Sequence, residues 1–182
     1  MSKILCAFVA ILAFCLGSPA GEIHNLCMRP VPDQLAKVKA LIQAKPAVVN
    51  EKDADGSTPL SWASIRGGRE LLQLLITNKA ELNSRDSTGA TPLHSAAMAN
   101  NKDAVEVLVA AGAKVDVADQ FTRTPLFFSV SSQKETNRLE VMKLLLDHGA
   151  NPNTGVPTTI SAVAKSMKDP AIFELLKKYG GR

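Results

Sequence analysis

Apolar residues recur along the chain in short groups at helical spacing. Between Asp33 and Lys45-Pro46 they follow one face of a helix, at Leu35, Val38, Leu41 and Ile42. Asp33 stands where a helix N-cap is expected, and Pro46 cannot continue a helix. The pattern therefore predicts an amphipathic helix within these limits.

Two kinds of apolar segment alternate in the next hundred residues. One kind is rich in small side chains and occurs at Ser61–Arg66, His94–Asn100 and Phe127–Ser131. The other carries branched and long aliphatic residues and occurs at Glu70–Thr77, Ala104–Ala111 and Leu139–Asp147. Both show helical spacing, so we expect pairs of short helices in which the first helix packs closely and the second supplies bulk.

A fixed period connects these pairs. Thr58-Pro59-Leu60, Thr91-Pro92-Leu93 and Thr124-Pro125-Leu126 recur every 33 residues, and Thr158-Thr159-Ile160 follows after 34. Proline suits the first turn of a helix and the threonine hydroxyl can cap it. A period of this length indicates an all-α repeat solenoid in which each unit needs its neighbours to bury its apolar face.

The second repeat carries the most specific residues, Thr91-Pro92-Leu93-His94-Ser95-Ala96 and Ala111-Gly112-Ala113. In these residues the chain resembles the ankyrin-repeat family, whose units combine a helix-turn-helix with a β-hairpin-like loop. The resemblance covers Asp33 to Gly180. It implies a repeat domain at 33–182, divided into an N-terminal capping part-repeat at 33–57, central repeats at 58–90, 91–123 and 124–157, and a C-terminal capping repeat at 158–182.

Three departures from the family pattern stand out. Ser61 replaces the family histidine, and Lys79 replaces the glycine that ends the second helix, so we expect a less regular helix end there. Four extra residues fall within 131–138, in the turn between the helices of the third repeat.

The N-terminus reads as a secretory signal peptide. A single Lys3 precedes a 13-residue apolar run from Ile4 to Leu16, and Ser18-Pro19-Ala20 offers small residues for cleavage after Ala20. The run is shorter than the ~20 residues of a membrane-spanning helix. We therefore assign 1–20 to the signal and 21–32 to a lead-in, and expect no stable membrane anchor after cleavage.

Composition adds little to this interpretation. The formal charge of +4 becomes about +3 without Lys3, and the basic residues are interspersed with acidic ones, which gives no indication of nucleic-acid binding. Removal of 1–20 would leave Cys27 as a single thiol, either a small half-buried apolar residue, or a group that forms an intermolecular disulfide or is reactive. His24 is isolated and is read as a surface residue.

No pattern of catalytic, cofactor-binding or metal-binding residues emerges. Glu51-x-Asp53-x-Asp55-Gly56 resembles the start of a calcium loop, but Trp62 stands where the bidentate glutamate belongs. The resemblance implies that His94 has a structural role, in which it forms hydrogen bonds between neighbouring turns. The sequence therefore predicts a protein that is not an enzyme and needs no cofactor.

The resemblance implies a binding role, because ankyrin proteins hold protein partners on the concave face formed by hairpins and first helices. The family's variable positions on that face include the candidate partner-binding residues Asp55, Arg66, Met98, Phe121, Arg123 and Ser131. Arginine, methionine and aromatic residues are enriched at interfaces. Phe121 is either exposed for a partner or folded back onto Phe127 or Phe128, whereas Trp62 is expected in the core.

The resulting hypothesis is an exported, monomeric protein–protein interaction module. We expect a bacterial periplasm, with secretion as the alternative, because the residues after 20 offer no disulfide pair and no glycosylation sequon. Two other functions remain open: a secreted effector acting on a host protein, and a small enzyme with an unrecognised site.

Overall fold

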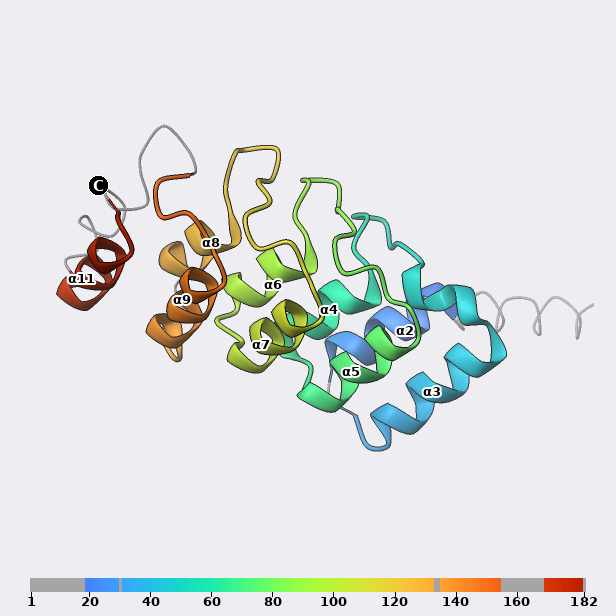
Figure 1. Cartoon of the computed structure of the whole chain (residues 1–182). Coiled ribbons are helices and arrows are strands. Elements are labelled where there is room, and N and C mark those ends of the chain that lie inside the picture. Colours follow the sequence, from blue (N-terminus) through green and yellow to red (C-terminus); the bar gives the residue numbers. More distant parts are fainter. Residues whose placement is uncertain (1–18, 30, 133–134, 155–168, 182) are drawn as a thin grey trace, which may run out of the picture.

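The computed structural model describes residues 19–29, 31–132, 135–154 and 169–181. Its helices pair and stack in a row (Figure 1). They are α2 (Pro19–Met28), α3 (Gln34–Ala44), the 3-10 helix η1 (Pro46–Asn50), α4 (Pro59–Arg66), α5 (Arg69–Thr77), α6 (Pro92–Met98), α7 (Lys102–Ala110), α8 (Pro125–Ser131), α9 (Arg138–Asp147) and α11 (Pro170–Lys178). These ranges contain no strand, so the predicted all-helical repeat fold is confirmed.

The Thr-Pro pairs begin the first helix of each central repeat. Thr58 and Thr124 accept a hydrogen bond from the backbone N–H three residues later. Thr91 forms a capping box with His94. The Thr91 hydroxyl accepts the backbone N–H of His94, and the His94 imidazole accepts the backbone N–H of Thr91. The threonine of each Thr-Pro pair, which predicted where these helices begin, therefore also caps them.

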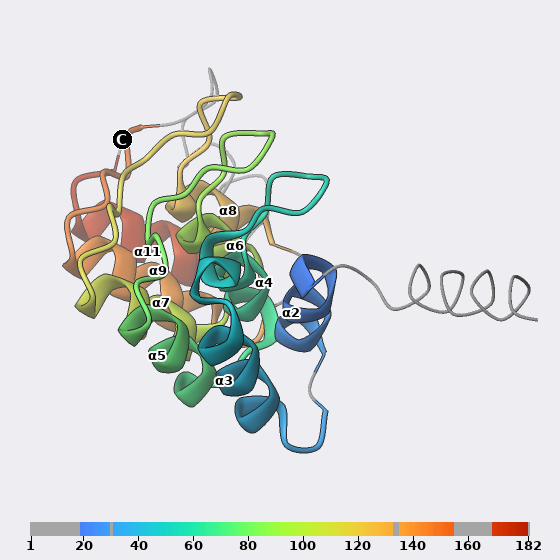
Figure 2. The ribbon, with the colours of Figure 1, turned by 90° about the vertical axis from the view of Figure 1, so that its right-hand side faces the viewer.

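Small side chains let the first helices approach one another. Neighbouring members of the row α2, α4, α6 and α8 contact each other more extensively than neighbouring second helices do. The residues at these contacts are fully buried and small: Ala63, Ser64, Ala96, Ala97 and Ser129. The stack therefore curves towards the first helices, and the hairpins project on the same side (Figure 2). Together they form the concave face.

Each hairpin is built around one aspartate. Oδ1 of Asp53, Asp86 and Asp119 accepts hydrogen bonds from the backbone N–H groups two and four residues later, at 2.8–3.0 Å. Backbone hydrogen bonds of 2.9 Å also join neighbouring hairpins, from Ser87 to Asp55 and from Gln120 to Thr88. The row of hairpins is therefore continuous with the stacked helices.

The end of α5 corrects one expectation. Lys79 adopts a φ of +69°, in the place where Gly112 and Gly149 have φ values of +94° and +93°. The following N–H of Ala80 donates to the Leu75 carbonyl at 3.0 Å, as at the other two helix ends. The predicted irregularity is therefore wrong, because the chain keeps the same turn and places a lysine in left-handed backbone.

Thr122 shows the same departure in the third hairpin. It has a φ of +61° where Gly56 and Gly89 have φ values of +76° and +82°. A Cβ at Gly56 would lie 3.0 Å from the Ser87 nitrogen, so glycine also permits close approach of the first two hairpins.

The segment expected as a lead-in contains the first helix of a further repeat. α2 packs against α4 as α4 packs against α6, with Ile23 and Cys27 buried. His24 is buried rather than on the surface, which corrects the expectation for this residue. Its Nε2 lies 3.0 Å from the Ser57 carbonyl oxygen. Asp33, at the start of α3, has a φ of +57° and makes no side-chain cap.

The two histidines explain how α2 fits the stack. His94 bonds the carbonyl of Arg123, the residue before the next Thr-Pro pair, and His24 bonds the equivalent carbonyl of Ser57. The equivalent of His24 in α4 is Ser61, 37 residues later instead of 33, so the fixed period does not reveal it.

The extra residues of the third repeat lengthen the turn between α8 and α9. α8 ends at Ser131 and α9 begins at Arg138, whereas α6 ends at Met98 and α7 begins at Lys102. Arg138 is buried and donates to the Ser132 carbonyl at 2.6 Å, while the Ser132 hydroxyl donates to the Met98 carbonyl at 2.7 Å. These bonds join both ends of the turn to the packed helices.

α11 forms the last helix of the row and packs on α9 through Ile172 and Leu176. The Tyr179 hydroxyl donates to the Asp147 carboxylate of the preceding repeat. The Thr158-Thr159-Ile160 copy and most of the predicted signal peptide lie outside the described residues.

Candidate functional site

The third hairpin carries the most strongly held polar group on the concave face. Asp119 is buried, and its Oδ2 accepts from Arg123 Nε at 2.8 Å and from the terminal guanidinium nitrogen at 2.7 Å. Burial alone would raise the pKa of this carboxyl. The hydrogen bonds from Arg123 and Phe121 outweigh it, so the pKa lies below the ordinary value.

Arg123 is sandwiched between two aromatic rings. Its Cζ lies 4.7 Å from the ring centroids of both Phe121 and Phe128. Phe121 therefore packs on Arg123 rather than on Phe127 or Phe128, and its side chain remains 57% exposed. Arg123 supports the hairpin, while Phe121 presents an aromatic surface to solvent.

His94 lies below this stack and is a structural residue. Its Nδ1 accepts the Thr91 backbone N–H at 3.0 Å, so the ring proton sits on Nε2 and is donated to the Arg123 carbonyl at 3.1 Å. Burial lowers the pKa of the imidazole, against smaller effects that include the hydrogen bond to Arg123. The neutral ring therefore joins two repeats.

Three of the predicted partner-binding residues lie at the ends of successive first helices. Arg66 ends α4 and is exposed, Met98 ends α6 and is 46% exposed, and Ser131 ends α8 and is exposed. The Ser131 hydroxyl donates to the Phe127 carbonyl of its own helix at 2.9 Å. Arg66 and Met98 therefore offer the more available contacts.

Asp55 lies apart from these helix ends, at the exposed tip of the first hairpin. Its backbone N–H donates to Asp53, and its carbonyl accepts from Ser87. The structure thus distributes the six predicted residues over two levels of the concave face, the hairpins and the ends of the first helices.

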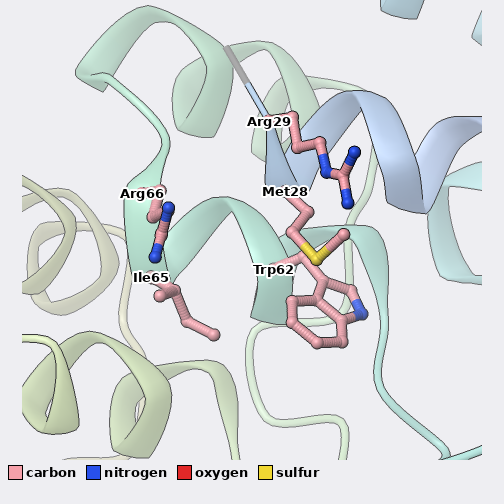
Figure 3. Close-up of a pocket in the computed structure, with 5 residues that line it drawn as sticks. All are labelled: Met28, Arg29, Trp62, Ile65 and Arg66. Carbon is pink, nitrogen blue, oxygen red and sulfur yellow. The ribbon is translucent and has the colours of Figure 1, made fainter.

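The structure adds a pocket that the sequence did not reveal. It has a volume of about 320 Å³ and lies between the ends of α2 and α4 (Figure 3). Met28 and Arg29 line it from α2 and the residue after it, and Trp62, Ile65 and Arg66 line it from α4. Trp62 is half-buried and forms one wall rather than lying wholly in the core.

Comparison with protein families agrees with the geometry. The family described as "Ankyrin repeats (3 copies)" matches residues 28–119 and 66–156, which together span more than two thirds of the chain. The chain belongs to the ankyrin-repeat family. Members are generally protein–protein interaction modules and are typically non-enzymatic. No curated protein matched the chain in a similar comparison.

Ankyrin-repeat hairpins also account for the calcium-like stretch. Asp53 holds its own turn through Oδ1, and its Oδ2 accepts the Trp62 indole N–H at 2.7 Å. The described residues contain no group of three or more histidine, cysteine, aspartate or glutamate side chains placed to hold a metal ion. No helix among them has the length and apolar character needed to cross a membrane.

Cys27 belongs to the core of this ankyrin stack. Its side chain is 1% exposed, and burial raises the pKa of its thiol to about 12. The thiol is therefore protonated at neutral pH and unreactive.

Proposed function

We propose that this protein is an exported interaction module that binds a partner protein on its concave face, with Phe121 as the central contact. The observation that carries the proposal is the exposed Phe121 ring, held in place by Arg123, which is itself fixed by Asp119. A rigid aromatic group loses little conformational freedom on binding, and such residues often dominate interface energies. Met98 and Arg66 extend the same face.

Affinity capture tests this proposal. The purified protein is immobilised and exposed to an envelope extract of its source cells, and captured proteins are identified by mass spectrometry. We expect Phe121→Ala to weaken capture of the partner about tenfold or more, with a small change in melting temperature because the side chain is largely exposed.

The matched control is Phe173→Ala. Phe173 is 40% exposed and lies on α11, a second helix outside the concave face. Equal loss of capture in both variants, or no loss in either, would contradict the assignment to the concave face. Arg123→Ala is unsuitable as a contact test, because Arg123 holds the hairpin.

Export rests on the sequence of residues 1–20, and we propose the bacterial periplasm as the compartment. Intact-mass measurement of the protein recovered from the periplasmic fraction is expected to give a chain that begins at Gly21. Full-length protein in the cytoplasmic fraction would contradict this proposal. Recovery from the medium or from host cells would favour secretion or an effector role instead.

A further inference from the structure

The arginines of the described residues divide into two groups. Four have hydrogen-bond partners within the protein: Arg69, Arg85, Arg123 and Arg138. Arg29 and Arg66 are exposed, and their guanidiniums have neither a hydrogen bond nor an ion pair with any described residue. Both line the pocket between α2 and α4. The two guanidiniums without a partner thus belong to residues that line the same pocket.

The other walls of this pocket are apolar. Met28, Trp62 and Ile65 line it, and no acidic side chain does (Figure 3). The Trp62 ring is fixed because its Nε1 donates to Asp53 Oδ2 at 2.7 Å, and Asp53 is held by two backbone N–H groups of its hairpin. The aromatic wall is therefore formed before any ligand binds.

Charge and shape select the occupant. Two guanidiniums repel a cationic ligand and can each hold a carboxylate through paired hydrogen bonds. The indole and the methionine offer an apolar surface for an aliphatic side chain. A volume of about 320 Å³ lies at the lower end of the range for ligand sites. The exposed Met98 ends α6, the next first helix after α4, which suits an extended chain rather than a small molecule.

From these observations we infer that the pocket binds an acidic segment of the partner, with glutamate or aspartate side chains on Arg29 and Arg66 and a neighbouring aliphatic side chain against Trp62. This inference rests on the proposed function and gives the chemistry of the partner. It also assigns a binding role to Arg29 and Met28, at the end of α2.

The protein contains a reporter of this site, because Trp62 is its single tryptophan. The probes are acetylated pentapeptide amides that contain two glutamates and three leucines in every order. Control peptides carry glutamine in place of glutamate. Each is titrated into the protein purified after expression of the full-length chain, and Trp62 emission is followed at low salt.

We expect at least some glutamate peptides to change Trp62 emission with a Kd on the order of 0.1–1 mM, as suits a short flexible ligand. The glutamine peptides are expected to bind at least tenfold more weakly. Added salt is expected to weaken binding of the glutamate peptides, because exposed charges are screened.

Arg29→Gln and Arg66→Gln are each expected to weaken binding about tenfold, since each removes one charge-assisted contact. The matched control is Lys39→Gln, which removes the same charge from an exposed position on α3 and is expected to leave binding unchanged. Circular dichroism checks that the helices persist in each variant.

The inference is overturned if no glutamate peptide alters Trp62 emission, if glutamine peptides bind equally well, or if both arginine variants bind as the parent does. Capture that depends on Phe121 would still support the proposed function in that case. Conversely, peptide binding without capture of any partner would leave the pocket chemistry intact and count against the proposed function.

Discussion

Lys79 and Thr122 occupy backbone that neighbouring repeats give to glycine. Left-handed backbone costs a residue with a Cβ about 1–2 kcal/mol, and threonine is β-branched, which makes Thr122 the worse fit. The surrounding hydrogen bonds hold these conformations: the Ala80 N–H that follows Lys79 donates to the Leu75 carbonyl, and the Arg123 N–H that follows Thr122 donates to Asp119 Oδ1. Each residue therefore marks a place where local preference is overruled by packing.

We expect Lys79→Gly and Thr122→Gly to raise the free energy of unfolding by about 0.5–1 kcal/mol each. This value is the strain energy removed from the folded state, minus the stability lost because glycine gives the unfolded chain more conformational entropy. Urea unfolding measures the effect as a shift in midpoint at constant slope. Gly112→Ala is the converse control and should destabilise the protein. Destabilisation by both glycine variants would contradict the strain argument.

His94 predicts a pH dependence of stability. Its pKa is lowered in the folded state, chiefly by burial, whereas the unfolded state has the ordinary value near 6.5. Between these two values the unfolded chain binds more protons, so stability is complete above about pH 6.5 and falls as the pH drops through the lowered pKa.

The measurement is urea unfolding at about pH 7.5 and 5.5, on either side of the unfolded value. We expect the parent to lose stability between about pH 7.5 and pH 5.5, and His94→Gln to lose less. The variant is nevertheless expected to be less stable than the parent at both pH values. Asp119 titrates in a lower range and does not interfere, because its pKa lies below the ordinary carboxyl value. Identical pH dependence in both proteins would exclude His94 as the source.

At the scale of elements, α2 differs most from expectation. Because it packs on α4 as a repeat helix, Ile23→Ala is expected to destabilise the protein by about 3 kcal/mol, the usual effect of truncating a fully buried aliphatic side chain. Leu35→Ala is the control, since Leu35 is 42% exposed on α3. Urea midpoints of the two variants give the comparison. Similar small effects would mean that α2 is not part of the folded stack.

Periodicity predicted the helices from α4 to α9 because each copy repeats the Thr-Pro cap and the aliphatic second helix. It could not reveal α2, which lacks the Thr-Pro pair and is joined to the stack by a connection of different length. His24 was the available signal, since it repeats the role of His94 two units earlier. Unless His24 is recognised as the equivalent of His94, the sequence does not distinguish a buried histidine from a surface one.

The candidate site was predictable only in part. The concave positions at Arg66, Met98 and Phe121 follow from the repeat register, and all three are exposed. The sequence could not show that Phe121 packs on Arg123, because the ion pair with Asp119 decides which way the guanidinium points. The pocket was also hidden, since two of its five lining residues, Met28 and Arg29, lie at the end of α2 and just after it.

At the scale of the whole molecule, each repeat touches mainly its neighbours, so a local defect should fade along the stack. Ile172 is fully buried in α11. We expect Ile172→Ala to speed amide hydrogen exchange in α11 about a hundredfold, which corresponds to roughly 3 kcal/mol of lost packing. Exchange in α4 is expected to change less than about threefold. Uniform acceleration through all helices would indicate a single cooperative unit instead.

Hydrogen bonds between repeats join residues about one period apart, from 27 positions for Asn153 and Gly180 to 38 for Thr154 and Asp116. The sequence distance between contacting residues is therefore set by the repeat and not by the length of the chain. Folding rates of small proteins fall as that distance grows relative to chain length. A version of this protein with a duplicated central repeat should consequently fold no more slowly than the original, because the added repeat brings no longer loop to close before the next contact forms.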